Sequence, residues 1–201
     1  DGFTGFKTAA AEELPAATAV MDPFHVVRLA GEGLEKCRQR VQQDTLGHRG
    51  RRGDPLFQAR QTLNTGDALL TDRQRERLMV LFTPDEHAQV EATWGVYQRI
   101  ITAYREPDPH EGKRLMQAVI DSLREGIPTV LTETRKLGRT LNKRADDVLA
   151  YFDRPGTSNG PTEAINGRLE HLRGSALGFR NLTNYIARCL FEAGGFRPRL
   201  H

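Results

Sequence analysis

Apolar residues recur at intervals of three and four over most of this 201-residue chain, and that spacing constrains the fold more than any other feature. It is the spacing of a helix that buries one face. The alternation with a period of two that is typical of strands is almost absent. The predicted helices cover residues 5–14, 24–43, a segment after Thr71, a segment after Thr83, and 110–125, 128–152, 161–173 and 181–193.

Two of these helices have a recognisable start. Thr71 is followed three residues later by Gln74, and Thr83 by Glu86, which are two capping boxes. The helix after Thr83 would carry one apolar stripe, made of Val90, Trp94, Tyr97, Ile101 and Tyr104. This pattern predicts that Trp94, the only tryptophan, belongs to the core instead of stacking on a nucleic-acid base.

One segment has the pattern of a strand. Residues 17–22, Ala-Thr-Ala-Val-Met-Asp, form a short apolar run that ends on an acid, as a buried parallel strand does. Pro23 then opens the first turn of the helix over 24–43, so that strand and helix together form an α/β fragment. The predicted fold class is mainly α with a small α/β start, and we expect the other strands of that sheet to lie outside the chain.

The composition indicates a soluble protein and argues against a membrane protein. Charged residues make up 27% and mean hydropathy is −0.55, which is typical of a soluble protein. No apolar run reaches the roughly 18 residues that a membrane span needs. No signal peptide is visible, the chain begins without Met, and its two cysteines suit a reducing compartment. We expect a piece of a longer cytoplasmic protein without a membrane partner.

Arginine occurs in clusters and gives a pI of about 9.1. Arg49, Arg51 and Arg52 lie in one Gly-rich loop, and Arg168 and Arg173 follow near the C-terminus. The planar guanidinium donates two parallel hydrogen bonds to a phosphate. These positions are candidate contacts to a nucleic-acid backbone, and the alternative is a solvated basic face.

A strong turn precedes Glu163. Ser158, Asn159 and Gly160 supply turn and cap residues, and Pro161 opens the next helix. Glu163 would then lie in the first helical turn, where a carboxylate is stabilised by about 0.3–1 kcal/mol through the helix dipole. Helix capping is one interpretation. The other is a metal ligand, because the turn and cap are already complete without this acid.

Two further acids are candidate ligands. Asp22 ends the predicted strand, at the edge where open α/β sheets place their sites, and His25 follows on the first helical turn. Asp22 also suits an N-cap, and His25 a partly buried core histidine. Asp1 is followed by Gly, a turn and a helix, as if a strand had been cut just before its last acid.

Four segments together resemble the DDE transposases of bacterial insertion sequences, specifically the ISL-three group. They are DGFTGFKTAAAEELP, AVMDPFHVVRLA, CRQRVQQDTLGHRGRRGDPLF and SNGPTEAINGRLEHLRGSALGFRN, and the resemblance covers essentially the whole chain. It implies an RNase H-like catalytic core in which three acids hold two Mg²⁺ ions, with Mn²⁺ as a substitute. It also implies DNA as the partner and a homo-oligomer in the active complex.

The resemblance assigns roles to individual residues. Glu163 matches the last acid of the triad, within a Ser-Asn-Gly-x-x-Glu segment that includes Asn159 as a supporting residue. Asp1 matches the second acid and would hold metal with Glu163, while Asp22 and His25 match an Asp-x-x-His signature. In a rival assignment Asp22 is the second acid and Asp1 the first.

The resemblance also implies a division of the chain. Residues 1–46 would be part of an RNase H-like α/β segment, 47–152 a helical insertion, and 153–201 the C-terminal helices that complete the core. The first acid and the DNA-end-binding domain would lie upstream, so the isolated chain is expected to be inactive. The alternative function is a non-catalytic, basic helical domain, a transposase remnant that binds nucleic acid or a partner.

Overall fold

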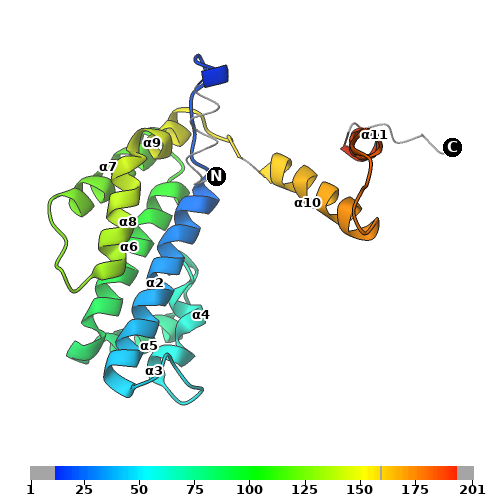
Figure 1. The fold of residues 1–201 in the computed structure, drawn as a ribbon. Helices are drawn as coiled ribbons and strands as arrows, with labels where there is room; N and C mark the ends of the chain where they lie inside the picture. Colours follow the sequence, from blue (N-terminus) through cyan, green and yellow to red (C-terminus); the bar gives the residue numbers. More distant parts are fainter. Residues whose placement is uncertain (1–11, 159, 194–201) are drawn as a thin grey trace. The chain divides into compact units, whose positions relative to one another are not determined.

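The computed structural model describes residues 12–158 and 160–193 (Figure 1). The chain divides into two compact units, the first ending at Thr157 and the second beginning at Ser158. Each unit is described by itself below.

The first unit is built on a bundle of four helices: α2 (Pro23–Leu46), α6 (Ala88–Arg105), α7 (Pro109–Arg124) and α8 (Thr132–Lys143). Helix α2 packs against α6 and α8, and α7 packs against the same two helices, so the four close around one core. Helix α9 (Ala145–Asp153) packs on α7. Between α2 and α6 the chain forms the short elements α3 (Pro55–Gln58), α4 (Arg60–Leu63), η1 (Asp67–Leu69), α5 (Asp72–Phe82) and η2 (Asp85–His87).

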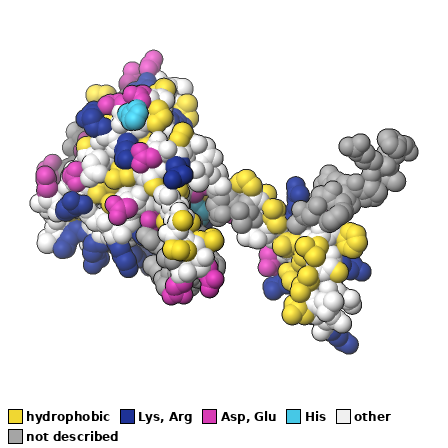
Figure 2. All heavy atoms as spheres, turned by 90° about the horizontal axis from the view of Figure 1, so that it is seen from above, with side chains coloured by type: hydrophobic (Ala, Val, Ile, Leu, Met, Phe, Trp, Pro, Cys, Tyr) yellow, Lys and Arg dark blue, Asp and Glu magenta, His cyan; other side chains and the backbone are white. Residues whose placement is uncertain are grey.

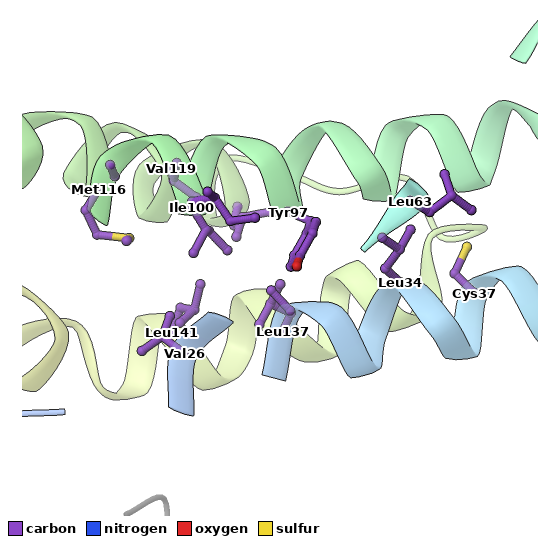
Figure 3. Packing of buried hydrophobic residues seen from close by; sticks show 14 of the residues in the cluster. Val26, Leu34, Cys37, Leu63, Tyr97, Ile100, Met116, Val119, Leu137 and Leu141 are labelled. Atoms are coloured by element: carbon purple, nitrogen blue, oxygen red, sulfur yellow. The ribbon is translucent and has the colours of Figure 1, made fainter. Parts of the chain in front are cut away.

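The core of the bundle contains the apolar stripes that the sequence predicts. Figure 3 shows Val26, Leu34, Tyr97, Val119 and Leu141 pointing toward one another from the four helices. All are at most 7% exposed, and Cys37 of α2 is fully buried beside them. Trp94 is partly buried against the Phe82 ring, with ring centroids 5.6 Å apart, which confirms its core role.

The strand over 17–22 does not form. No strand is present among residues 12–158 and 160–193, so the mainly α prediction is confirmed, whereas the small α/β start is not observed. A strand needs a neighbouring strand to satisfy its backbone groups, and the described chain offers none. Instead, the Met21 N–H donates to the Asp147 carbonyl oxygen at 2.9 Å, and Asp22 caps α2. The RNase H-like core remains a prediction.

Two predicted helix boundaries are corrected. The Thr71–Gln74 capping box is confirmed, whereas Thr83 forms none: it keeps helical dihedral angles at the end of α5, and its hydroxyl donates to the Met79 carbonyl oxygen at 3.1 Å. The predicted helix over 128–152 is broken at Arg144 into α8 and α9. There Arg144 Nε lies 2.7 Å from Asp147 Oδ2, and both side chains are nearly buried. That ion pair holds the break, which apolar periodicity does not reveal.

The second unit is a helical hairpin of α10 (Gly160–Ser175) and α11 (Leu182–Ala193). Its turn includes Gly178 at φ 92°, a left-handed conformation that glycine adopts without strain. Hydrophobic side chains gather on the visible face of this part in Figure 2. Five large hydrophobic residues of the second unit are 49–97% exposed: Leu177, Leu182, Ile186, Leu190 and Phe191.

No helix in the described part of the chain is long and apolar enough to cross a membrane.

Helix α2 shares the bundle core with the helices of residues 88–153, so the observed units differ from the predicted division at 46/47. That division concerns the fold of a complete catalytic domain, and it stays a prediction.

Candidate functional site

Two of the predicted site residues, Asp1 and Asn159, lie outside the described residues. The structure therefore gives the surroundings of Asp22, His25, Glu163 and the arginines.

Asp22 is the N-cap of α2, and its Oδ1 accepts a hydrogen bond from the Phe24 N–H at 2.8 Å. The capping interpretation of this residue is thus confirmed. Burial raises the pKa of the Tyr104 hydroxyl, and Tyr151 and the charge of Asp22 raise that pKa further. His25, one turn into α2, is half-buried and packs edge-on against Phe24. Asp22 thus has a structural role in this unit, with or without a metal.

Glu163 lies in the first turn of α10, and it is exposed. In the turn before it, the Gly160 N–H donates to Ser158 Oγ at 3.0 Å. Glu163 and Asp22 belong to different compact units. An exposed carboxylate at a helix start suits the oxygen-ligand preference of Mg²⁺.

No metal site is complete within the described chain. No group of three or more His, Cys, Asp or Glu residues among residues 12–158 and 160–193 is arranged to hold an ion. Glu163 can supply one oxygen ligand, and one carboxylate does not make a two-metal site. The described residues alone are therefore insufficient for the predicted metal chemistry.

Polar side chains of α2 connect this helix to the Gly-rich arginine loop that follows it. Arg38 is 2% exposed and donates to Glu35 and to the Gln42 side-chain oxygen. Gln42 in turn donates to Asp54 Oδ2 at 3.1 Å, and Oδ2 also accepts from the Arg51 N–H. Burial raises the pKa of the Glu35 carboxyl, but the hydrogen bonds from Arg38 and Gln39 outweigh it and lower that pKa overall.

The arginines of that loop face solvent. Arg49, Arg51 and Arg52 are all exposed, and none forms an ion pair with a carboxylate in the described part of the chain. In the second unit Arg168 is exposed without such a pair, whereas Arg173 lies 3.5 Å from Glu170. Arginines that pair with no carboxylate among residues 12–158 and 160–193 can bind a polyanion.

Sequence reasoning missed the residues beneath the loop: Arg38, Gln42, Gly50 and Asp54. A signal for two of them was present, because Arg38 and Gln42 directly follow the core residues Cys37 and Val41 on α2. A charged residue beside a core stripe has to be paired when it is buried. The contact of Gln42 with Asp54, in a loop 12 residues away, could not be read from spacing.

Comparisons with known proteins agree with the sequence. The family model DDE_Tnp_ISL3, described as a transposase, matches residues 1–189. No curated protein and no solved structure matches the chain.

Proposed function

This chain belongs to the DDE transposases of the ISL-three group, and from that premise we propose that it is part of a catalytic domain that cuts and joins DNA strands during transposition of an insertion sequence. The observation that carries the proposal is the family match, which extends over 1–189. Family membership also implies DNA as the partner. We place the reaction in the cytoplasm and in a homo-oligomeric complex.

In this proposal Asp1 and Glu163 hold Mg²⁺, or Mn²⁺ in its place. The chemistry that the bound ions supply is activation of a water, and then of a 3′-hydroxyl, for attack on a DNA phosphodiester. The exposure of Glu163 in the first turn of α10 supports it as a ligand. Asn159 and His25 are the proposed supporting residues, and in the rival assignment Asp22 is the second acid.

The arginines have a different role in the proposal. Arg49, Arg51, Arg52, Arg168 and Arg173 bind the phosphate backbone, which positions the DNA without reading its sequence. The exposure of Arg49, Arg51, Arg52 and Arg168 supports this role. Each phosphate that they neutralise adds about one to the slope of log affinity against log salt concentration.

The test of the catalytic role is Glu163→Gln in the complete transposase, assayed for Mg²⁺-dependent cleavage of its element-end DNA. We expect cleavage to fall roughly 100-fold or more, because a metal ligand is lost, while DNA affinity changes less than about twofold. The matched control is Glu170→Gln, an exposed acid on the same helix, which should cleave at the wild-type rate.

Cleavage that survives Glu163→Gln would overturn the assignment of this acid. If the arginine variants then still lost DNA binding, the non-catalytic nucleic-acid-binding domain would become the better description. The 201-residue chain alone should show no Mg²⁺-dependent nicking, because we place the first acid upstream of it. Robust nicking by this chain would contradict that placement.

A further inference from the structure

We propose that the loop 47–54 is a pre-shaped phosphate-binding loop, in which Asp54 and Gly50 are positioning residues that hold the arginines and backbone amides in place. The inference rests on the proposed DNA binding and deepens it. A loop that is merely basic and a loop with a fixed shape make opposite predictions for the removal of an acid.

Asp54 accepts the hydrogen bonds that hold the loop in its conformation. Its Oδ2 accepts from Gln42 Nε2 at 3.1 Å and from the Arg51 N–H, so one oxygen ties the loop to α2. The His48 ring joins this group: its Nδ1 accepts from the Gly50 N–H at 3.3 Å and lies 3.5 Å from Asp54 Oδ2. Removing the carboxylate would free the loop at the segment that carries the arginines.

Gly50 makes the closest approach of the loop to α2. Its φ is +123°, and an added Cβ would lie 2.8 Å from both Gln42 Oε1 and Phe57 Cδ2, and 3.0 Å from Arg38 Nη1. A side chain is strained at this φ, and its Cβ would require the neighbouring side chains or the loop to shift. Gly53, three residues later, has open space around the same position. The tight packing is therefore specific to Gly50 within this loop.

The base of the loop is buried and charged. The Arg38 guanidinium is nearly inaccessible, and it lies 5.6 Å from the centroid of the Phe57 ring. Arg60 stacks on the same ring at 4.3 Å and remains exposed. Burying a guanidinium is costly unless it is fully paired, so this base holds one defined loop conformation.

A fixed loop lowers the cost of binding. Ordering a long side chain on association costs part of the binding free energy, and pre-organisation removes that part. The neighbouring backbone amides of a fixed loop can also donate to a phosphate oxygen. The chemical class of ligand is thus a phosphodiester backbone, bound through exposed arginines on a loop whose shape is set from α2.

The first test is Asp54→Ala in the 201-residue chain, with affinity measured on a short fluorescent DNA duplex of arbitrary sequence over a range of salt concentrations. We expect roughly threefold to tenfold weaker binding, since freed side chains must be ordered again, and a smaller salt slope as phosphate contacts are lost. Asp54→Asn keeps an oxygen acceptor and should bind at least as tightly as wild type.

The control for charge is Asp44→Ala, because Asp44 is an exposed acid at the end of α2 that pairs with Arg40. Loss of this negative charge should leave DNA affinity unchanged or raise it. If Asp54→Ala also bound as tightly as wild type or tighter, charge alone would explain the loop, and the inference would be overturned.

The second test involves no change of charge. Gly50→Ala should weaken DNA binding roughly threefold or more, whereas Gly53→Ala should leave it unchanged. Fluorescence of Trp94 verifies that each variant keeps its folded bundle. Equal affinities for the two glycine variants would overturn the inference.

A triple change of Arg49, Arg51 and Arg52 to Ala separates this inference from the proposal beneath it. If the triple variant loses DNA affinity while Asp54→Ala and Gly50→Ala bind as wild type, the loop binds DNA without needing its shape. If the triple variant binds as wild type, the proposed DNA contact itself is wrong.

Discussion

The bundle and the C-terminal hairpin contain helices of matching length but differ in how well they bury their apolar residues. Helices α7 and α10 both have 16 residues, and α8 and α11 both have 12. In the bundle Leu141 is 0% exposed, whereas in the hairpin Leu190 is 60% exposed. Four helices close around a core, while two share a single seam. Helical periodicity therefore specifies the helices of both units but a closed core only in the bundle.

The two candidate functional features also lie in different units. The arginine loop is held by a buried polar network within the bundle, whereas Glu163 lies on the hairpin, where most side chains are exposed. The phosphate-binding candidate thus rests on a packed core. The candidate metal ligand rests mainly on the local structure of α10 and its cap.

The largest expected effect that separates the two units comes from Leu141→Ala. It should lower the free energy of unfolding of the bundle by about 3–4 kcal/mol, because it leaves a cavity in the core. Leu190→Ala should change that quantity by less than about 0.5 kcal/mol. Urea titration followed by Trp94 fluorescence measures the bundle alone, since Trp94 is the only tryptophan. Equal losses would show that the two units do not differ in this way.

A smaller effect is expected where Gly112 of α7 lies against α6. A Cβ at Gly112 would lie 2.8 Å from the Ala103 carbonyl oxygen and 2.9 Å from the Phe152 ring. Gly112→Ala should therefore destabilise the bundle by about 1–3 kcal/mol through overpacking. Gly95→Ala, at an open position on α6, should stabilise it by about 0.5–1 kcal/mol. The thermal unfolding midpoints of the two variants measure both effects. A change of midpoint with the same sign in both variants would contradict the packing argument.

The ion pair of the bundle should contribute more to stability than the ion pair of the hairpin. Arg40 donates to both carboxylate oxygens of Glu133 at 2.9 Å, joining α2 to α8, whereas the Arg173–Glu170 pair is exposed. Glu133→Gln should cost about 1–2 kcal/mol at neutral pH, and Glu170→Gln less than about 0.5 kcal/mol. Chemical denaturation at several pH values measures both.

The pH dependence of that bundle ion pair has a definite sign. The hydrogen bonds from Arg40 lower the pKa of Glu133 in spite of its burial. A carboxyl with a lowered pKa in the folded state stabilises that state above its unfolded pKa, about pH 4, and loses this effect as pH falls through the folded pKa. Wild type should therefore lose more stability than Glu133→Gln below about pH 4. Parallel pH profiles for the two proteins would contradict the assignment.

The smallest expected effect is a gain in the hairpin. An added Cβ at Gly167 of α10 meets no atom within 4 Å, so Gly167→Ala should stabilise that helix by up to about 1 kcal/mol. Amide hydrogen exchange of α10 should slow, while the urea midpoint reported by Trp94 stays unchanged. A shift of that midpoint would mean that the hairpin and the bundle unfold together.

Local patterns in the sequence predict much of this fold. The stripe through Val90, Tyr97 and Ile101 is buried, and the Thr71 capping box forms, because both depend only on residues within a few turns. The break at Arg144 was missed because it depends on an ion pair as well as on periodicity. The strand at 17–22 failed for a related reason: its partners would have to come from other parts of a sheet.

The candidate site, like the fold, could be predicted from the sequence only in part. Exposure of Arg49, Arg51 and Arg52 follows from a polar, Gly-rich loop, and the location of Glu163 in a first helical turn follows from Ser158 and Pro161. The packing beneath the loop could not be predicted, because it joins α2 to Asp54 and Phe57 through tertiary contacts. Whether Asp1 or Asp22 is the second acid was left open by the sequence, and Asp1 lies outside the described residues.

The most direct test of the catalytic assignment is iron-directed cleavage of the complete transposase bound to DNA, with Fe²⁺ in place of Mg²⁺. Added hydrogen peroxide is reduced by the bound Fe²⁺ to hydroxide and a hydroxyl radical that cuts the polypeptide next to the metal ligands, and added ascorbate reduces the resulting Fe³⁺ back to Fe²⁺. The account predicts cuts beside Asp1 and Glu163 that disappear in Glu163→Gln and persist in Glu170→Gln. Cuts beside Asp22 and His25 without any at Glu163 would contradict it, and would leave Glu163 as a residue that only stabilises the start of α10.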